Sequence, residues 1–582
     1  MRERYAWRSL TIAVLLAFIA VSVILQIIRI QNGPEADVFR ALGLDYGRFP
    51  KTFYPERGAI YDRNGHMLAG SKTVYEVGVQ LSEAVDKPAI AITAGNVLGI
   101  NAQDILGKMV EPPAGLQYLV LEDYVDSDQA GELRQLQKTS IALAAPGQAS
   151  RLRGLVLTAH PQRDYPEGAL ASNVLGFVSR EGRGYFGVEE KYNSLLAGKP
   201  VRVWVPTDPN KAADIPRVPD GTTLVLTIDR ELQASVEQIL DQAIEKYEAQ
   251  HGTIVALNPK DGSILALASS PRMDPNQFWN YGVVYQNASE FDRALSLPYE
   301  PGSVFKVLTM AAALDSGTVV PSTPFLDTGI IQVGGATIRN WDDKAWGQQD
   351  MIGCLQHSLN VCLASVAQSM GAQTFYLYMN RFGIGHLTGT DLAGEAAGRL
   401  KVPGDSDWYP VDLATNAFGQ GVSVTPLQVI TAATAVANDG RMVVPHVLYA
   451  MVRDGRQYRV PAQYSGSPVS PETAHTLSQM LAVSLENESS SALVPGYRIA
   501  GKTGTAQIPG PVGYEDGATN ASFIGWGPVD DPQFMIYVWL ERPSTSIWGS
   551  ETAAPVFSDV AKKLVLLMSI PPDSVRAEIA KP

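Results

Sequence analysis

The chain has 582 residues, more than a single hydrophobic core normally holds, so two or three folded units are expected. Its apolar fraction of 45% and its charged fraction of 18% are typical of folded protein and argue against long disordered segments. The formal net charge of −13 argues against nucleic acid as a partner, because a surface that binds phosphates needs a basic face.

The N-terminal region indicates the compartment of the protein. Residues 10–28 form an almost unbroken apolar run that is long enough to cross a bilayer as one helix. Three arginines precede the run, and positive residues stay on the cytoplasmic side of a membrane. The run is longer than the apolar part of a cleaved signal peptide, and no A-x-A site follows it. We therefore expect a cytoplasmic tail at 1–8, a retained transmembrane helix at 9–29, and all later residues outside the cytoplasm.

Two further units are expected after the membrane helix. Residues 30–50 have mixed polar character and are expected to form a connector. Short strand and helix patterns then alternate, which predicts an α+β module at 51–205. The stretch 206–220 is rich in Pro, Asp and Gly and is expected to be a linker. A larger domain at 221–570 and a C-terminal tail at 571–582 complete the predicted organisation.

The pattern of the larger domain predicts a single antiparallel sheet. Residues 251–270 form two apolar runs around Asn-Pro-Lys-Asp-Gly, which is typical of a hairpin. A largely helical middle is expected from about 302 to 438, and three more strand candidates lie after residue 497. Two early and three late strands with helices between them predict an α+β domain, namely a five-stranded antiparallel sheet covered by helices.

A hydroxyl and an amine are spaced by one helical turn in the motif S-V-F-K, which runs from Ser303 to Lys306. Apolar spacing after a Pro-Gly pair predicts a helix that begins here, so Lys306 reaches back to Ser303. A serine is a weak nucleophile until a base accepts its proton. Lysine can be that base only where burial or nearby positive charge disfavours its ammonium form. Alone, the motif is weak evidence, because a capping serine and a solvated lysine are the simpler explanation.

A second polar motif, Ser358-Leu359-Asn360, lies between two predicted helices and suggests that they meet at a polar turn. The Ser358 hydroxyl could relay a proton to a leaving amine, and the Asn360 amide could orient Lys306 and a substrate backbone. In isolation, a pair of ordinary helix-capping residues is the simpler explanation of this motif.

A third motif, Lys502-Thr503-Gly504-Thr505, lies on a predicted strand. Lys502 and Thr503 are suited to hold a substrate carboxylate, and Gly504 lets another backbone come close. The strand edge can pair with an extended peptide, and the amides of Thr505 and Ser303 would form an oxyanion hole. Alone, the motif also fits a surface strand with a bulge. Because the three motifs occur together and in order, on a helix start, between helices and on a strand, a single site is predicted.

This combination of motifs resembles that of class B penicillin-binding proteins, which are peptidoglycan D,D-transpeptidases. Residues 57–69, 163–178 and 184–198 resemble signatures of the family's N-terminal pedestal, or dimerisation-like, module, and we assign no chemistry to them. Further matches are YEPGSVFK, FGIGHLTGTDLAGEA and FGQGVSVTPLQ. The resemblance implies an elongated α+β pedestal beside a penicillin-binding transpeptidase domain, without a second catalytic domain.

The resemblance also implies a reaction cycle. Ser303 attacks the penultimate D-Ala carbonyl of a stem peptide ending in D-Ala-D-Ala, and an amine of a neighbouring stem then attacks the acyl-enzyme. β-Lactams acylate the same serine, and no metal or cofactor is expected. The other implied roles are those of Lys306 as base, of Ser358 and Asn360 as its assistants, and of Lys502, Thr503 and Thr505 in donor binding.

The partners implied by the resemblance are a polytopic membrane glycosyltransferase and other cell-division membrane proteins. ASFIGWGPVDDPQF and SIWGSETAAPVF resemble the septal branch of the family more than the elongation branch. Three alternatives stay open: an elongation-type transpeptidase, a non-catalytic scaffold or β-lactam sensor, and a hydrolase of β-lactams or of terminal D-Ala. The pedestal and the anchor argue against a free β-lactamase. Glu395 lies outside the E-x-x-L-N pattern of a deacylating carboxylate and is expected at a turn or on the surface.

The only two cysteines, Cys354 and Cys362, lie on either side of the second motif and are too few for a disulfide framework or a thiolate metal cluster. Within one straight helix, eight residues would separate them by about 12 Å, so free thiols are favoured. A turn at Ser358 would bring them closer and leaves a bridge open, since the exported compartment permits disulfides. The neighbouring His357 is expected to be solvated or bonded to backbone.

Overall fold

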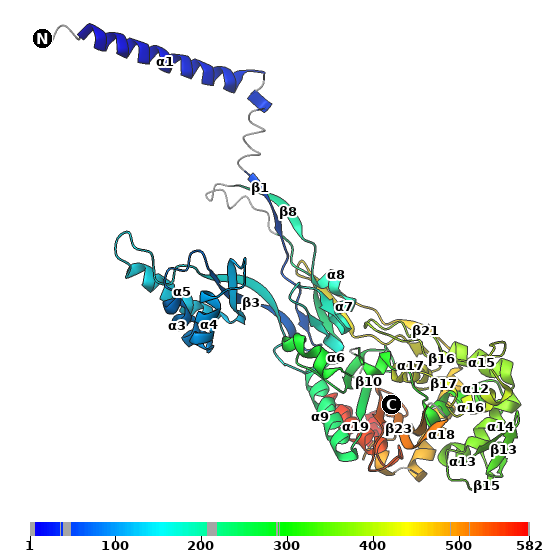
Figure 1. The fold of residues 1–582 in the computed structure, drawn as a ribbon. Coiled ribbons are helices and arrows are strands. Elements are labelled where there is room, and N and C mark those ends of the chain that lie inside the picture. Colours follow the sequence, from blue (N-terminus) through cyan, green and yellow to red (C-terminus); the bar gives the residue numbers. More distant parts are fainter. Residues whose placement is uncertain are drawn as a thin grey trace. The chain divides into compact units, whose positions relative to one another are not determined.

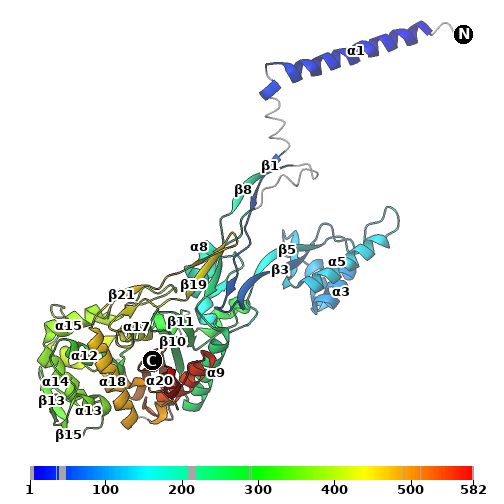
Figure 2. The same cartoon turned by 180° about the vertical axis from the view of Figure 1, so that it is seen from behind.

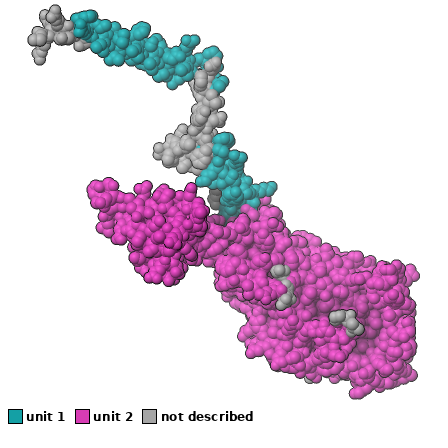
Figure 3. Space-filling model, in the orientation of Figure 1, with its two compact units in different colours: residues 1–56, 198–221 teal, residues 57–197, 222–582 magenta. Residues whose placement is uncertain are grey.

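The computed structural model describes residues 6–34, 36–38, 48–206, 218–286, 289, 291–488, 490–510 and 513–579. Much of the predicted connector and linker, and part of both predicted tails, lies outside these residues. The chain divides into two compact units, residues 1–56 with 198–221 and residues 57–197 with 222–582, which Figure 3 colours separately.

The first unit contains an apolar helix and a two-stranded ribbon. Helix α1 (Ala6–Asn32) includes the segment Leu10–Asn32, whose mean hydropathy is 2.8 and whose side chains are exposed. Among the described residues, it is the one helix that is long and apolar enough to cross a membrane. The ribbon consists of β1 (Arg48–Phe53) and β8 (Val201–Pro206), which pair in antiparallel fashion.

The N-terminal part of the second unit, residues 57–197, is built around the long strand β3 (Met67–Gln80), which pairs with β4 on one side and with β5 on the other. Its main remaining elements are β4 (Tyr118–Val125), β5 (Leu155–Asp164), α3 (Lys87–Leu98), α4 (Ala102–Val110) and α5 (Ser127–Ala142). The three helices bury their apolar residues against these strands (Figure 1). Each begins at an Asp or Asn whose side chain accepts a hydrogen bond from an N–H of the first turn.

The sheet that contains β3 also includes strands from distant parts of the chain. Its order is β20-β19-β9-β2-β3-β4, with β5 on the other side of β3. The additional strands are β2 (Ile60–Tyr61), β9 (Thr223–Leu226), β19 (Leu448–Arg453) and β20 (Arg456–Arg459). Strand β2 pairs with β9 in parallel, so segments on both sides of the predicted linker share one sheet.

A second, five-stranded sheet forms the centre of the C-terminal part of this unit (Figure 2). In sheet order its strands are β11 (Ile264–Ser269), β10 (His251–Leu257), β24 (Phe534–Glu541), β23 (Tyr514–Gly527) and β22 (Ala500–Pro509). All neighbouring strands are antiparallel, which confirms the predicted five-stranded antiparallel sheet.

Helices cover both faces of the five-stranded sheet. Along β10, Ile254 and Ala256 belong to one apolar core and Val255 and Leu257 to another, because successive side chains point to opposite faces. Helices α9 (Arg230–Tyr247) and α19 (Ala553–Leu567) contribute to the first core. Helices α12 (Lys306–Asp315), α17 (Pro426–Ala437) and α18 (Pro471–Glu488) contribute to the second. Burial on both faces explains why the strand sequences are continuously apolar.

The middle of this domain is less purely helical than predicted. Besides α12 and α17 it contains α13 (Met351–Gln356), α14 (Asn360–Met370), α15 (Ala372–Arg381) and α16 (Pro410–Asn416). It also contains three small antiparallel sheets, β12 (Phe325–Asp327) with β15 (Gly347–Gln349), β13 (Ile330–Val333) with β14 (Ala336–Arg339), and β16 (Arg399–Leu400) with β17 (Val422–Ser423). Gly334 and Gly335 join β13 to β14 with φ of 59° and 85°, as a tight hairpin turn requires.

Candidate active site

Ser303 lies in the 3-10 turn η3 (Gly302–Phe305), directly before α12. Gly302 has a φ of 61°, a left-handed conformation that favours glycine. A Cβ atom at Gly302 would lie only 2.9 Å from the Cβ of Ala506 on β22. The Gly302 N–H donates to the Gly419 carbonyl at 3.0 Å. Glycine therefore allows the turn that carries Ser303 to lie directly against β22.

Lys306 is fully buried one turn after Ser303. Its Nζ donates to the Ser358 carbonyl at 2.5 Å, to Ser358 Oγ at 3.1 Å and to Asn360 Oδ1 at 2.8 Å. Burial, and then the nearby charge of Lys502, lower the pKa of Lys306 well below its ordinary value. A neutral amine at this position has a lone pair that can accept the proton of a hydroxyl.

Ser358 lies in the turn between α13 and α14 with a φ of 54°, which non-glycine residues rarely adopt. Such backbone conformations typically cost about 1–3 kcal/mol and are concentrated at functional sites. Asn360 Nδ2 donates to the Arg339 carbonyl at 3.1 Å, which orients the amide so that its Oδ1 faces Lys306.

Cys354 and Cys362 form a disulfide with their Cα atoms 6.0 Å apart. The preference for free thiols was therefore wrong. It assumed one straight helix, whereas the chain turns at Ser358 and brings α13 and α14 together. The bridge closes the loop that carries the second motif.

Lys502 lies on β22 and is 4% exposed. Its Nζ donates to Ser358 Oγ at 3.0 Å and to Thr503 Oγ1 at 3.3 Å. Burial lowers the pKa of Lys502 to about 7, and the charge of Glu488 opposes this shift. Two buried amines, on α12 and on β22, therefore share the Ser358 hydroxyl.

The rest of the third motif brings β22 close to η3. Thr503 and Thr505 point to the same side of the strand, and Thr505 Oγ1 accepts from the Gly549 N–H at 3.0 Å. A Cβ atom at Gly504 would lie 2.3 Å from Ser522 Oγ and 2.9 Å from Val304 Cγ1, so only glycine allows this packing. Because β22 is an end strand of its sheet, its outer edge can pair with an extended peptide.

The structure thus brings all eight predicted site residues together. A hydroxyl at a helix start, a buried amine one turn later, a second hydroxyl between two amines and a polar strand edge form one constellation. This arrangement can activate a serine, relay a proton and hold an extended peptide, which are the requirements of acyl transfer.

Comparison with known proteins agrees with this geometry. Residues 252–562 match the penicillin-binding protein transpeptidase domain, and residues 52–211 match the penicillin-binding protein dimerisation domain. The chain belongs to the penicillin-binding transpeptidase family. It is 32% identical to stage V sporulation protein D of Bacillus subtilis, over 89% of this chain and 79% of that protein. It is 29% identical to the peptidoglycan D,D-transpeptidase FtsI of Escherichia coli, over 89% of this chain and 85% of that protein.

Solved structures of penicillin-binding proteins resemble this chain over most of its length. Penicillin-binding protein 3 of Mycobacterium tuberculosis, solved in complex with ampicillin, superposes with a TM-score of 0.69 at 28% identity. The match covers 90% of this chain and 97% of that one. Penicillin-binding protein 2X of Streptococcus thermophilus superposes with a TM-score of 0.73 at 23% identity, covers 90% of this chain and 80% of that one, and supports the fold alone.

One residue of this penicillin-binding transpeptidase that the sequence left without a role is Glu300, which lies just before η3, the turn that carries Ser303. Its carboxylate accepts from the Gly421 N–H and from the Tyr514 hydroxyl, both at 2.9 Å. Burial raises the pKa of Glu300. Glu300 thus ties the segment before Ser303 to two neighbouring segments. The sequence feature that could have pointed to Glu300 is its position as an acidic residue directly before a Pro-Gly turn.

His357 and Glu395, which received no catalytic role from the sequence, make contacts that stabilise the structure. His357 Nδ1 pairs with Glu488 at 2.6 Å, and its ring stacks on Trp346 with centroids 4.0 Å apart. The expectation that His357 is solvated or bonded to backbone was therefore wrong. Glu395 accepts from the N–H and the hydroxyl of Thr388 at 2.6 and 2.5 Å, which stabilises the loop that contains both residues.

Proposed function

We propose that this chain cross-links peptidoglycan stem peptides as a D,D-transpeptidase, through an acyl-serine intermediate on Ser303. The observation that carries the proposal is the Ser358 hydroxyl, held between Lys306 Nζ and Lys502 Nζ at 3.1 and 3.0 Å beside the helix start that bears Ser303. Relatives named peptidoglycan D,D-transpeptidase support the substrate class.

In the acylation step, Ser303 Oγ forms a bond to the carbonyl carbon of the penultimate D-Ala, and its proton passes to the neutral Lys306 Nζ. The backbone amides of Ser303 and Thr505 stabilise the oxyanion. The bond to the terminal D-Ala nitrogen then breaks. That nitrogen receives a proton from Lys306 through the Ser358 hydroxyl, and D-Ala leaves.

Donor binding depends on β22. The Lys502 ammonium and the Thr503 hydroxyl hold the terminal carboxylate, while the strand edge beside Gly504 and Thr505 pairs with the peptide backbone. Asn360 keeps Lys306 oriented through its Oδ1. Glu300 acts as a positioning residue for the nucleophile turn.

In the transfer step, an amine of a second stem peptide attacks the ester carbonyl, and its proton passes through Lys306 Nζ to Ser303 Oγ. Ser303 leaves as a hydroxyl, so the cross-link forms and the enzyme is regenerated. A β-lactam opens at the same serine, but its leaving nitrogen stays tethered in the site. The resulting ester therefore persists. The relative of Mycobacterium tuberculosis solved with ampicillin and with aztreonam supports this assignment.

We further propose that α1 is a retained membrane anchor with a cytoplasmic N-terminus and that the catalytic domain is extracytoplasmic. Its partners would be a polytopic membrane glycosyltransferase and other cell-division membrane proteins. Similarity to FtsI of Escherichia coli supports a septal role over an elongation role. Depletion of the protein should abolish incorporation of a fluorescent D-amino acid at septa. Loss confined to the lateral wall would instead indicate elongation.

Mass spectrometry of the full chain after treatment with labelled penicillin tests the central assignment. The adduct is expected on the peptide that contains Ser303 and should be retained for many minutes, whereas rapid turnover would indicate a hydrolase. Ser303→Ala should abolish labelling and fail to support wall cross-linking. Ser316→Ala, at the opposite end of α12, is the matched control and should label normally. An adduct elsewhere, or growth supported by Ser303→Ala, would contradict the proposal.

A further inference from the structure

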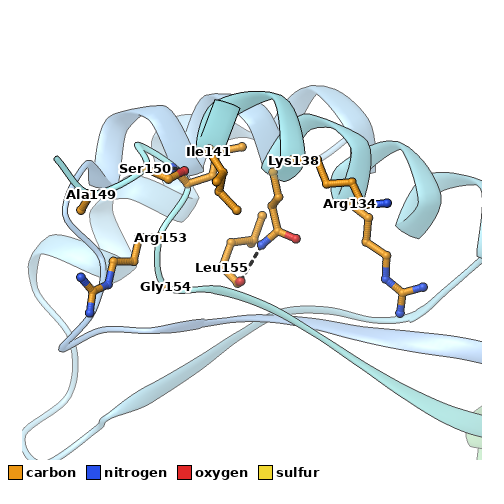
Figure 4. A pocket seen from close by; sticks show the side chains of 10 residues that line it. Arg134, Lys138, Ile141, Ala149, Ser150, Arg153, Gly154 and Leu155 are labelled. Atoms are coloured by element: carbon orange, nitrogen blue, oxygen red, sulfur yellow. Dashed lines mark hydrogen bonds between the residues drawn. The ribbon is translucent and has the colours of Figure 1, made fainter. Parts of the chain in front are cut away.

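Residues 57–197 contain an open pocket that the proposed transpeptidation does not use. It has a volume of about 540 Å³ and lies between one face of α5 and the segment 149–155, which leads into β5 (Figure 4). We call it the basic pocket, and its defining residues are Arg134, Lys138, Ile141, Arg153 and Leu155. Pockets of this size accommodate small ligands or a few side chains.

The pocket has walls that are held in place by hydrogen bonds. Arg134, Gln137, Lys138 and Ile141 recur at the helical spacing that places side chains on one face of α5. Gln137 Nε2 donates to the Leu155 carbonyl at 2.7 Å and so fixes the helix to the start of β5. A hydroxyl–hydroxyl bond of 2.8 Å between Ser140 and Ser150 makes a second tie between the helix and the opposite wall.

The pocket is positively charged, whereas the net charge of the chain is negative. Arg134, Lys138 and Arg153 are exposed cations around it, although the chain carries a net charge of −13. Figure 4 shows Arg134 and Arg153 at opposite ends of the pocket. The Arg134 guanidinium lies over the Tyr75 ring at 4.5 Å, which orients it. Arg153 Nε lies 3.9 Å from a Glu83 carboxylate, but both side chains are more than half exposed and water screens the pair.

Apolar side chains complete the surface. Leu152 and Leu155 are buried in the floor, while Ile141 is 65% exposed at the edge. An occupant that matches this surface needs carboxylates for the cations, because guanidinium groups bind carboxylates through paired hydrogen bonds. It also needs aliphatic side chains that cover Ile141 and the floor.

We propose that the basic pocket binds a short acidic segment with aliphatic side chains, supplied by a partner protein. A membrane surface fits less well, because the site is concave and has three cations, whereas lipid-binding clusters contain about four to eight. Nucleic acid fits less well because the chain as a whole is acidic. The inference is independent of the acyl transfer at Ser303.

The test selects peptides from a random display library on the purified full chain in detergent. Selected sequences are expected to combine at least two acidic residues with aliphatic neighbours. A fluorescent synthetic copy of a selected peptide should bind the triple variant Arg134→Glu/Lys138→Glu/Arg153→Glu at least about tenfold more weakly than the wild type, because its charge-assisted hydrogen bonds are lost. Binding to the wild type should weaken as salt rises. The matched control is Lys108→Glu, which reverses an exposed cation on α4 outside the pocket and should bind like the wild type.

Three outcomes would overturn the proposal. The first is a selection that returns no acidic peptides. The second is a selected peptide that binds the triple variant as tightly as the wild type. The third is displacement of the peptide by phosphatidylglycerol vesicles but not by phosphatidylcholine vesicles, which would assign the pocket to lipid. Labelling of both variants by penicillin is measured in parallel and should equal that of the wild type. Reduced labelling of a variant alone would indicate misfolding, and absent labelling of the wild type would count against the Ser303 assignment. Neither result depends on whether the pocket proposal is correct.

Discussion

Two clusters of buried charge in the second unit differ in how their charges are balanced. In the cluster near β2, a single carboxylate, Glu189, is fully buried between two arginines. Arg163 Nε lies 2.6 Å from one carboxylate oxygen, and Arg57 Nε donates to the other at 2.8 Å. Backbone and side-chain oxygens of Gly58 and Asn193 accept further bonds from the same arginines.

The active-site cluster also has two buried cationic side chains, but a hydroxyl replaces the carboxylate between them. Lys306 and Lys502 both donate to Ser358 Oγ, and burial lowers the pKa of each lysine. The comparison teaches that burial alone does not indicate function. Arginines remain charged and need a counter-ion, whereas lysines without one can lose their protons and become bases.

The largest effect is expected for Lys306→Met, which removes the proposed base and leaves an apolar chain of similar length. The second-order rate constant of acylation by labelled penicillin should fall by about 10³-fold or more. The midpoint of thermal unfolding should change little, because removing a buried amine without a counter-ion offsets the loss of its hydrogen bonds to Ser358 and Asn360. A fall in stability comparable to that of a broken ion pair would show that the amine holds the site together.

The converse change is Glu189→Gln, which leaves two arginines around a neutral amide. We expect the free energy of unfolding to fall by about 3–5 kcal/mol, as for breaking a buried ion pair. The rate constant of acylation per folded molecule should not change. Chemical denaturation and penicillin labelling of the same samples measure both quantities. The control is Glu181→Gln at an exposed carboxylate, which should change neither the free energy of unfolding nor the rate constant of acylation appreciably.

A smaller effect is expected from pH. The Lys502 ammonium, which we propose binds the donor carboxylate, is lost above its pKa of about 7. The second-order rate constant of acylation should therefore decrease about tenfold per pH unit above that value, because this constant reports the free enzyme. Lys502→Arg keeps its charge and should remove this decrease, even if its absolute rate is lower. An unchanged alkaline limb in that variant would assign the titration to another group.

The sequence predicted which residues come together in the candidate site, because each motif lies where an element begins, turns or runs along an edge. Ser303 follows a Pro-Gly turn, Ser358 lies between two helices, and Lys502 lies on a strand. The central sheet was also predictable, since continuous apolar runs around the Asn-Pro-Lys-Asp-Gly turn leave few alternatives to a buried hairpin.

The features that were missed depend on contacts between distant residues. The free-thiol preference for Cys354 and Cys362 failed because local spacing does not show where one helix stops and another starts. Glu300 receives its role from Gly421 and Tyr514, which lie more than a hundred residues away in the chain. The domain limits given by composition, including the linker at 206–220, stay a prediction.

The tight approach of β22 to η3 limits how this protein can evolve under antibiotic pressure. Side chains at Gly302 or Gly504 would collide with Ala506 or Ser522 and push Ser303 away from β22, on which we propose that both a β-lactam and the natural donor bind. Resistance through these two glycines would therefore cost wall synthesis as well.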